Sequence, residues 1–457
     1  MLRRYFLKTF PVYAGALAKA GRLWPMGEKQ NGENYGAHPK SETVIRNIGG
    51  MSLEELRSFH RDELENKYLP VWDDRRIDWE YGGFMPYVEA DPRYIPPWKG
   101  RAVTATNEHM KDLVFNATNK EMYYQGRGIW VFSYLYNHFG KRERHLQAAR
   151  KGIDFIVKYC RDEKGYWNSE VTREGKFVQG SYNIYGDIYV ALGFAEYYRA
   201  TGDEKIREMA IDTVHGIAER ILSPTYQHLG WHGGGNEPGT KRLGTWQHFL
   251  SALTPLARYT GDDGVELTAR MCVRYILERH WRPELGVSLE LLDDEFQPFR
   301  EDPLVKNRTV SGWHSIQAAW MSMDEALRIG HRRMFLEAME MGRQNLQKCW
   351  YDDGEEAGLV TLANPEAKPA LPDDIRTFYH GWGATDDALI FALLAIEHTQ
   401  APWAVDWFDK IFKGGYRHAD RFNNHCLLHH PRRLFFVIDI LNHLIDRGGK
   451  VSDFLAA

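Results

Sequence analysis

The stretch Tyr198-Arg199-Ala200-Thr201-Gly202-Asp203 is repeated almost unchanged as Ala257-Arg258-Tyr259-Thr260-Gly261-Asp262. Glycine suits the left-handed residue that ends a helix, and aspartate suits the residue that caps the next helix. Asn137-His138-Phe139-Gly140-Lys141 and Leu327-Arg328-Ile329-Gly330-His331 are looser versions of the same junction. Each copy predicts a tight turn between two helices, so we expect a series of helical hairpins.

The helices on the two sides of these junctions differ in character. Helices before a junction are apolar nearly all round, as is typical of helices that other helices surround, whereas those after it carry one charged face. The apolar runs cover 127–139, 187–200, 246–260, 315–329, 385–398 and 433–446, and the charged runs cover 53–69, 143–159, 204–222, 265–280, 333–350 and 403–412. Repeated hairpins of this length predict an all-α (α/α)6 barrel over residues 51–457, with six inner and six outer helices. A superhelical solenoid is the alternative. Residues 79–84 are expected to form a short hairpin or loop at the barrel mouth.

The apolar runs open near side chains that could carry chemistry. They begin near Arg127, Tyr185, His248, His314, Asp387 and His430. If these helices point the same way, their N-termini and the positive ends of their dipoles meet at one end of the ring, which favours a developing oxyanion. Histidine has an ordinary pKa of about 6.5 and transfers protons near neutral pH. Two histidines on opposite sides of one carbon could invert a stereocentre next to a carbonyl, although a single histidine at a helix start is more often a cap or a core residue.

Composition narrows the class of ligand. The formal net charge is −4 without long runs of one sign, so we expect no nucleic-acid partner, which would need a basic patch. The 15 Trp and 24 Tyr fit a sugar-binding cavity, although aromatic rings also fill helical cores. His425 and His429 have metal-type spacing but no obvious carboxylate partner, so we predict no catalytic metal.

The N-terminus predicts export. Arg3-Arg4-Tyr5-Phe6-Leu7-Lys8 resembles a twin-arginine motif, and a short apolar stretch follows within residues 1–20. We therefore expect a signal peptide, a periplasmic protein and no membrane partner once the signal is removed; a disordered basic tail on a cytoplasmic protein is the alternative. Residues 21–50 read as a polar linker or arm. A homodimer is left open.

Five segments resemble the N-acylglucosamine 2-epimerase superfamily, in the order expected for that family. Gln125–Phe132 is similar to its Q-G-R-x-x-W segment, Gln247–Ala252 to M-H-L-L-E-A, and His314–Trp320 to H-x-I-E-x-x-W. Trp382–Leu389 resembles W-W-x-x-x-E-A-L, with Asp387 in place of Glu, and His430–Arg433 resembles the late H-x-x-R segment. The resemblance runs from about residue 52 to the end of the sequence.

The resemblance implies a fold, an activity and a set of roles. The fold would be the (α/α)6 barrel, and the activity that of a sugar epimerase or aldose–ketose isomerase without a cofactor. The residues that match the family's acid/base pair are His314 and His430. His248 would assist ring opening or sugar binding, and Arg127 would hold the oxygens on the carbonyl side of a mono- or oligosaccharide.

Two departures from the family pattern bear on this assignment. Gln317 and Ser251 stand where the family has Glu, and Gln317 cannot stabilise an imidazolium by charge. His429 adjoins His430, so the late histidine could be shifted by one position. We assign substrate contacts, including three stacking tryptophans, to Arg127, Trp130, Asp187, Gln317, Trp320, Trp382, Asp387 and Arg433.

The expected reaction is removal of the C2 proton of an open-chain aldose. Return of a proton to the opposite face of C2 gives the epimer, whereas protonation at C1 gives a ketose; the same acid/base pair serves both. One alternative is a glycoside hydrolase or lyase on the same barrel, which would need two carboxylates across a cleft. The other is a carbohydrate-binding relative that has lost activity through Gln317 and Ser251.

Overall fold

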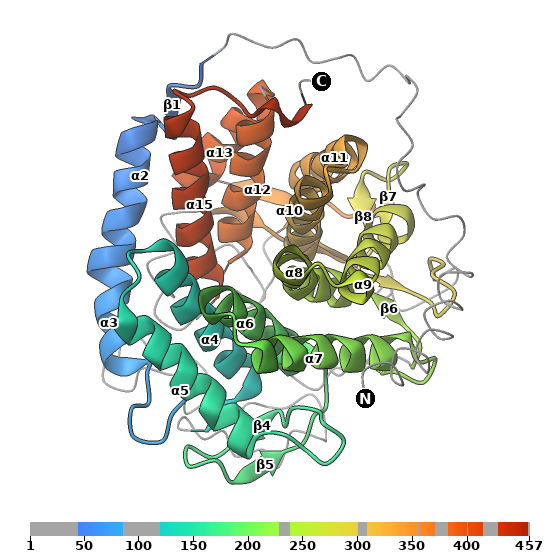
Figure 1. Ribbon diagram of the computed structural model, residues 1–457. Coiled ribbons are helices and arrows are strands. Elements are labelled where there is room, and N and C mark those ends of the chain that lie inside the picture. The colour runs from blue at the N-terminus through green and yellow to red at the C-terminus, as the bar shows by residue number, and fades with distance from the viewer. Residues whose placement is uncertain are drawn as a thin grey trace.

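The computed structural model describes residues 44–85, 119–227, 238–299, 309–353, 356–370, 383–399, 401–414 and 428–455, and the predicted signal peptide therefore lies outside the described residues. Within these ranges the chain forms a ring of helical hairpins (Figure 1). The strands are short and pair in separate small sheets of two or three strands. The predicted (α/α)6 barrel is confirmed.

The inner ring consists of helices that are buried almost throughout, because few of their residues are polar on any face. Its members in the described part of the chain are α4 (Met122–His138), α6 (Tyr185–Thr201), α8 (Leu243–Thr260), α10 (Gly312–Ile329), α12 (Ala384–His398) and α15 (His429–Asp446). Consecutive members pack side by side around the ring. Their common environment explains why the sequence shows apolar runs rather than amphipathic ones.

The ring closes between its last and first members. Tyr134 of α4 stacks on Phe435 of α15 with ring centroids 4.9 Å apart, and its hydroxyl donates a 2.7 Å hydrogen bond to Asp439. Trp130 also packs on Phe435, at 5.7 Å. This contact between helices far apart in the sequence distinguishes a closed barrel from the solenoid alternative.

Amphipathic helices cover the ring from outside. They are α5 (Glu143–Tyr159), α7 (Glu204–Leu222), α9 (Asp263–Arg274) with a π-helical extension Tyr275–His280, α11 (Arg332–Cys349) and α13 (Pro402–Gly414). The first segment, α2 (Leu53–Asp62), continues through a π-helix, Glu63–Tyr68, into α3 (Leu69–Arg75), and α2 packs on α15 (Figure 1). The first and last helices of the barrel therefore form its remaining pair.

The predicted junctions adopt the expected turns. Gly202 and Gly261 are left-handed, with φ of +67° and +59°, and each ends an inner helix. Asp203 then accepts a hydrogen bond from the backbone of Lys205, and Asp262 caps α9 in the same way. Since these turns join inner to outer helices at one end of the barrel, the inner helices all begin at the other end, where the longer connections lie.

Short strands mark the end of the barrel at which the inner helices begin. β3 (Lys120–Glu121), β6 (Lys241–Arg242) and β10 (Val310–Ser311) each lead directly into an inner helix. Their partners come from the connections: β4 (Glu170–Val171), itself paired with β5 (Phe177–Gln179), then β9 (Leu291–Leu292) and β13 (Thr361–Leu362). The remaining hairpins are β7 (Trp281–Arg282) with β8 (Val287–Ser288) and β11 (Trp350–Asp353) with β12 (Glu356–Leu359). These pairings fix the residues that enter each inner helix.

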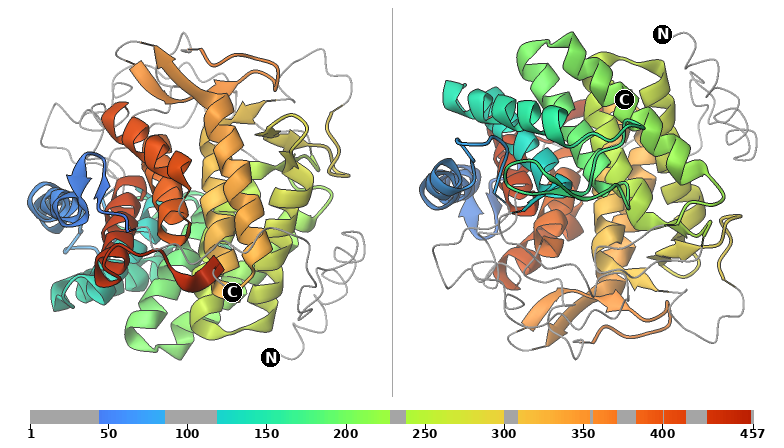
Figure 2. Two further views of the ribbon diagram at one scale, coloured as in Figure 1. Left: turned by 90° about the horizontal axis from the view of Figure 1, so that it is seen from above. Right: turned by 90° about the horizontal axis from the view of Figure 1, so that it is seen from below.

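Two segments outside the repeats pack on the barrel, and the first is the pair of short blue strands beside the blue helix in Figure 2. Residues 47–52 form a small hairpin, β1 (Asn47–Ile48) with β2 (Met51–Ser52), so the predicted polar arm is structured at its end. The predicted hairpin at 79–84 is a tight turn closed by a bridge between Ile77 and Phe84. It packs on α4 and α5: Phe84 stacks on Phe132 at 5.3 Å, and both backbone groups of Phe84 bond to the amide of Gln125.

Candidate active site

His314, in the first turn of α10, is held by a carboxylate from outside the helices. Its Nδ1 lies 2.9 Å and 3.0 Å from the two carboxylate oxygens of Glu290, and Arg242 donates to the same carboxylate at 2.7 Å. Burial alone would raise the pKa of Glu290, but His314 and Arg242 hold it well below its ordinary range. Glu290 is therefore ionised, and His314 directs its other nitrogen, Nε2, away from it. Sequence reasoning missed Glu290.

His248 lies next to His314, with ring centroids 5.7 Å apart and the rings nearly perpendicular. Its Nδ1 is 2.6 Å from the carbonyl oxygen of Gly244 and 2.5 Å from Nε2 of Gln247. Burial lowers the pKa of His248 well below its ordinary value, and the nearby His314 and Arg127 lower it further. His248 is therefore a neutral imidazole at neutral pH.

Of the two adjacent histidines near the end of the chain, His429 and not His430 lies on the same side of the inner ring as His248. His429 packs edge-on against Trp313 at 4.8 Å, and its Nδ1 is 3.3 Å from Asp387. Burial lowers the pKa of His429 to about 4, and the charge of Arg127 contributes in the same direction. Because His429 also lowers the pKa of His248, these groups share one electrostatic environment.

His430 faces a different side of α15. Its Nδ1 is 2.5 Å from Asp386, which also pairs with Nε of Arg433 at 2.6 Å. Arg433 in turn contacts Glu63 and His60 of the α2 and π-helical segment, at 3.1 Å and 3.0 Å. The positions predicted for His430 and Arg433 are therefore corrected: both residues belong to a buried polar network that fastens the first helices to the barrel. Adjacent residues of a helix point roughly 100° apart, so the histidine at the site is one position earlier in the sequence than predicted.

Asp387 is the centre of a dense set of hydrogen bonds at the start of α12. Its carboxylate lies 2.5 Å from Nη2 of Arg432 and accepts hydrogen bonds from the indoles of Trp313 and Trp320, at 2.7 Å and 3.0 Å. Burial alone would raise the pKa of Asp387, but Arg432, His429 and Trp313 hold it below its ordinary range. Of the two adjacent arginines in α15, Arg432 and not Arg433 therefore lies on the same side of the helix as His429.

Gln317 connects two of these groups. Its Nε2 donates to Asp387 at 2.8 Å, and its Oε1 accepts a hydrogen bond from Gln247 at 3.0 Å. The carboxylate beside His314 thus comes from Glu290 and not from position 317. Ser251 lies one turn after His248 in α8, and its hydroxyl donates to the carbonyl of His248.

Arg127, on α4, completes the group. Its Nη2 donates to the hydroxyls of Tyr123 and Tyr189, and its guanidinium lies 4.3 Å from the centre of the Tyr189 ring. The side chain is 3 % exposed, so the positive charge is directed by these tyrosines rather than by solvent. Its charge contributes to the depressed pKa of both His248 and His429.

Two glycines allow the histidine rings to pack directly on helix starts. A Cβ atom at Gly244 would lie 2.9 Å from Cε1 of His314 and 3.3 Å from Oε1 of Glu290. A Cβ atom at Gly383 would lie 2.5 Å from Cγ of His429, and Gly383 has φ of +116°. Both approaches to the histidine rings are shorter than side chains tolerate, so glycine is required at both positions.

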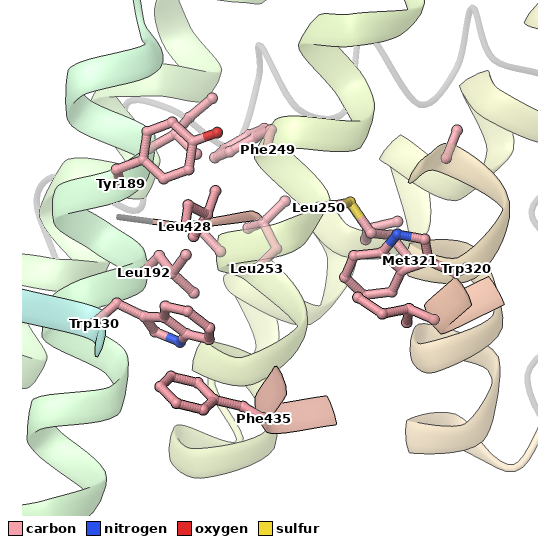
Figure 3. Close-up of a cluster of buried hydrophobic side chains, with 14 of the residues drawn as sticks. Trp130, Tyr189, Leu192, Phe249, Leu250, Leu253, Trp320, Met321, Leu428 and Phe435 are labelled. Carbon is pink, nitrogen blue, oxygen red and sulfur yellow. The ribbon is translucent and has the colours of Figure 1, made fainter. Parts of the chain in front are cut away.

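The other predicted contacts are distributed more widely. Trp130 lies in the apolar interior beside Phe435, in the same cluster as Leu192 and Leu253 (Figure 3). Asp187 pairs with Arg220 of the outer helix α7 at 3.3 Å, and burial raises its pKa to about 6. These partners place Trp130 in the core and direct Asp187 towards the outer helix. Trp382 lies outside the described residues.

The described residues contain no group of three or more His, Cys, Asp or Glu side chains suited to hold a metal ion. Among the described helices, none combines the length and apolar character needed to span a membrane. His425, the other half of the H-x-x-x-H spacing, is not among the described residues.

The fold and the histidine cluster define a class of barrel with its polar site at the end where the inner helices start. Residues 106–425 match the N-acylglucosamine 2-epimerase (GlcNAc 2-epimerase) family, and the chain belongs to that family. It is 24 % identical over 329 residues to a cellobiose 2-epimerase of Dictyoglomus turgidum, covering 68 % of this chain and 75 % of that protein. It is 22 % identical over 377 residues to the N-acylglucosamine 2-epimerase of Mus musculus, covering 80 % and 82 %.

A solved structure shares the fold at lower sequence identity. The cellobiose 2-epimerase from Bacillus thermoamylovorans B4167 superposes with a TM-score of 0.66 and 16 % identity, over 84 % of this chain and 99 % of that one. This similarity supports the fold, and the match of residues 106–425 to the family model confirms the family predicted from the sequence motifs.

Proposed function

We propose that this protein is a carbohydrate epimerase or aldose–ketose isomerase that moves a proton at C2 of an open-chain aldose without a cofactor. The relatives named above are sugar 2-epimerases, which supports the reaction class. The observation that carries the proposal is the meeting of three imidazoles and a guanidinium from four inner helices: His248, His314, His429 and Arg127.

The acid/base pair is His314 and His429. Glu290 fixes Nδ1 of His314 and leaves Nε2 for the substrate, and Asp387 lies near Nδ1 of His429 at a longer distance. A histidine oriented by a carboxylate on one nitrogen is suited to take or give a proton with the other. One imidazole removes the C2 proton and the other returns a proton, so His429 takes the role that the sequence assigned to His430.

The remaining groups prepare the substrate and stabilise charge. His248, a neutral imidazole between Tyr185 and His314, assists opening of the sugar ring. Loss of the C2 proton leaves an enediolate, and Arg127 supplies a positive charge preorganised by two tyrosine hydroxyls. Such preorganised charge is usually the largest contribution to catalysis of this kind. Return of the proton to C2 gives the epimer, and its delivery to C1 gives the ketose.

Exchange in heavy water tests the proposal. The protein is incubated with a panel of free aldoses and reducing disaccharides, and deuterium at C2 or C1 is followed by NMR. We expect deuterium to enter at least one sugar without bond cleavage. Release of reducing sugar from an oligosaccharide would instead favour a hydrolase. An absence of both exchange and cleavage on every sugar would favour a carbohydrate-binding relative.

A further inference from the structure

A buried chain of hydrogen bonds runs through the start of three inner helices and ends beside two histidines. Gln247 on α8 donates to Oε1 of Gln317 on α10 at 3.0 Å. Nε2 of Gln317 donates to Asp387 on α12 at 2.8 Å, and Asp387 lies 3.3 Å from Nδ1 of His429. At the other end, the amide of Gln247 packs against the ring of His248, whose Nδ1 donates to the carbonyl oxygen of Gly244 at 2.6 Å.

The direction of donation along this chain is fixed by Asp387. An ionised carboxylate can only accept hydrogen bonds, so Gln317 must turn its NH2 group towards Asp387 and its carbonyl oxygen towards Gln247. Gln247 must then present its own NH2 group to Gln317. Gln317 is 1 % exposed and Gln247 is fully buried, so water cannot replace either bond without opening the core.

We propose that Gln317 is a positioning residue that holds His429 and His248 in place relative to each other through this chain, and that the chain requires an amide at position 317. This inference rests on the proposed function and refines it, because it assigns a role to a residue that departs from the family pattern. An amide supplies a donating NH2 group and an accepting oxygen in a fixed plane, and both groups are used. Gln317, where the family has Glu, therefore suits its partners Gln247 and Asp387 and does not indicate lost activity.

A carboxyl group at position 317 could replace the amide only while it carries a proton. The titratable and charged groups around this position are Asp387 on α12, His429 and Arg432 on α15, and His248 on α8. The charge of Arg432 is already paired with Asp387 at 2.5 Å. A second carboxylate next to Asp387 would repel it, and burial would also disfavour the ionisation of the new group.

The protonated side chain of the Gln317→Glu variant would donate to Asp387 and accept from Gln247, as the amide does. Once ionised, it would place two carboxylates at hydrogen-bonding distance and break the bond to Asp387. The Gln317→Glu variant should therefore be active at low pH and lose activity as the pH rises. The Gln317→Leu variant, whose side chain has neither donor nor acceptor, should lose activity at every pH.

The test measures kcat and KM for C2 exchange, on a sugar that the wild-type protein accepts, from pH 5.5 to pH 8.5. We expect the ratio of kcat for Gln317→Glu to that of wild type to fall at least tenfold across this range, with recovery when the pH is returned. KM should change less than kcat, because the histidines and not the sugar-binding surface are displaced. Thermal melting at each pH establishes that both proteins are folded during the assay.

Gln344→Glu is the matched control. Gln344 on the outer helix α11 donates to the carboxylate of Glu340 at 2.6 Å, so this substitution also places two carboxyl groups together, but away from the histidines. It should follow the wild-type pH profile. A Gln317→Glu profile parallel to wild type would overturn the inference while leaving the proposed function intact. Absence of exchange by the wild-type protein on every sugar would overturn both.

Discussion

The carboxylate of Glu290 is shared between His314, at 2.9 Å, and Arg242, at 2.7 Å. The backbone of Glu290 is fixed as well, since its carbonyl accepts from the N–H of Leu243 and its own N–H donates to the carbonyl of Thr309, both at 2.8 Å. The carboxylate is therefore held in place and ionised, and it fixes the orientation of the His314 ring through Nδ1.

Glu290→Gln should weaken the proposed acid/base function of His314. Without the carboxylate, Nδ1 loses the acceptor that fixes the orientation and tautomer of the ring. We therefore expect kcat at neutral pH to fall roughly tenfold or more, as for loss of support to a general base. Glu290→Asp, which keeps a carboxylate, should recover part of this loss. A kcat for Glu290→Gln equal to that of wild type would show that Glu290 does not support the base.

His429→Ala and His430→Ala should separate chemistry from stability. Loss of a general acid or base reduces the rate by roughly 10²–10⁴-fold, so His429→Ala should abolish measurable exchange in protein that is still folded. His430→Ala removes a partner of the buried Asp386 and should cost about 1–3 kcal/mol of stability. The exchange rate of its folded fraction should stay within a few-fold of wild type. The opposite pattern would restore His430 to the acid/base pair.

The sequence predicted the barrel well because its signals are local. Gly202 with Asp203, and Gly261 with Asp262, end one helix and cap the next through contacts within a few residues, so the turns could be predicted without knowledge of the fold. The all-round apolar character of the inner helices likewise follows from their burial alone.

The site was predicted less completely because its geometry depends on register and on distant contacts. His429 and His430 are both buried at a helix start, and only the rotation of α15 against α12 decides which ring meets Asp387. Glu290 lies in an irregular connection, and it reaches His314 because β9 pairs with β6 just before α8. No local sequence pattern predicts that Asp387 meets His429 or that Glu290 meets His314. The position of His248 and His314 near the starts of inner helices, by contrast, could be predicted from the sequence.

Gly244→Ala should displace His314. The added Cβ would lie 2.9 Å from Cε1 of His314, so the ring or the start of α8 must move. Overpacking of this kind costs about 1–3 kcal/mol, and a shifted imidazole should lower kcat for exchange more than it changes KM. Gly216→Ala on the outer helix α7, where the new Cβ would meet Tyr166 at 3.5 Å, is the control and should leave turnover unchanged. Equal kcat values for the two variants would show that the close approach at Gly244 has no functional consequence.

The buried histidines also make folding stability depend on pH. Burial lowers the folded-state pKa of His429 and of His280 to about 4 and that of His248 well below its ordinary value, against an unfolded value of about 6.5. Above pH 6.5 these rings are neutral in both states and contribute no pH dependence. Below pH 6.5 the unfolded chain binds protons that the folded chain does not, so stability should fall between about pH 6.5 and pH 4, by up to about 1.4 kcal/mol per pH unit for each ring.

Urea unfolding at intervals from pH 7.5 to pH 4.5 measures this dependence. Nδ1 of the buried His280 lies 2.8 Å from the carbonyl oxygen of Leu289, and His280→Gln keeps a donor there without a titrating ring. Below pH 6.5 the free energy of unfolding should fall less steeply with decreasing pH for the variant than for wild type. Above pH 6.5 the two free energies should differ by a constant amount. Carboxylates such as Asp387, whose pKa is held below its ordinary range, titrate at more acidic pH and do not produce this difference. Identical slopes in the two proteins would mean that His280 binds its proton equally well in the folded and unfolded states.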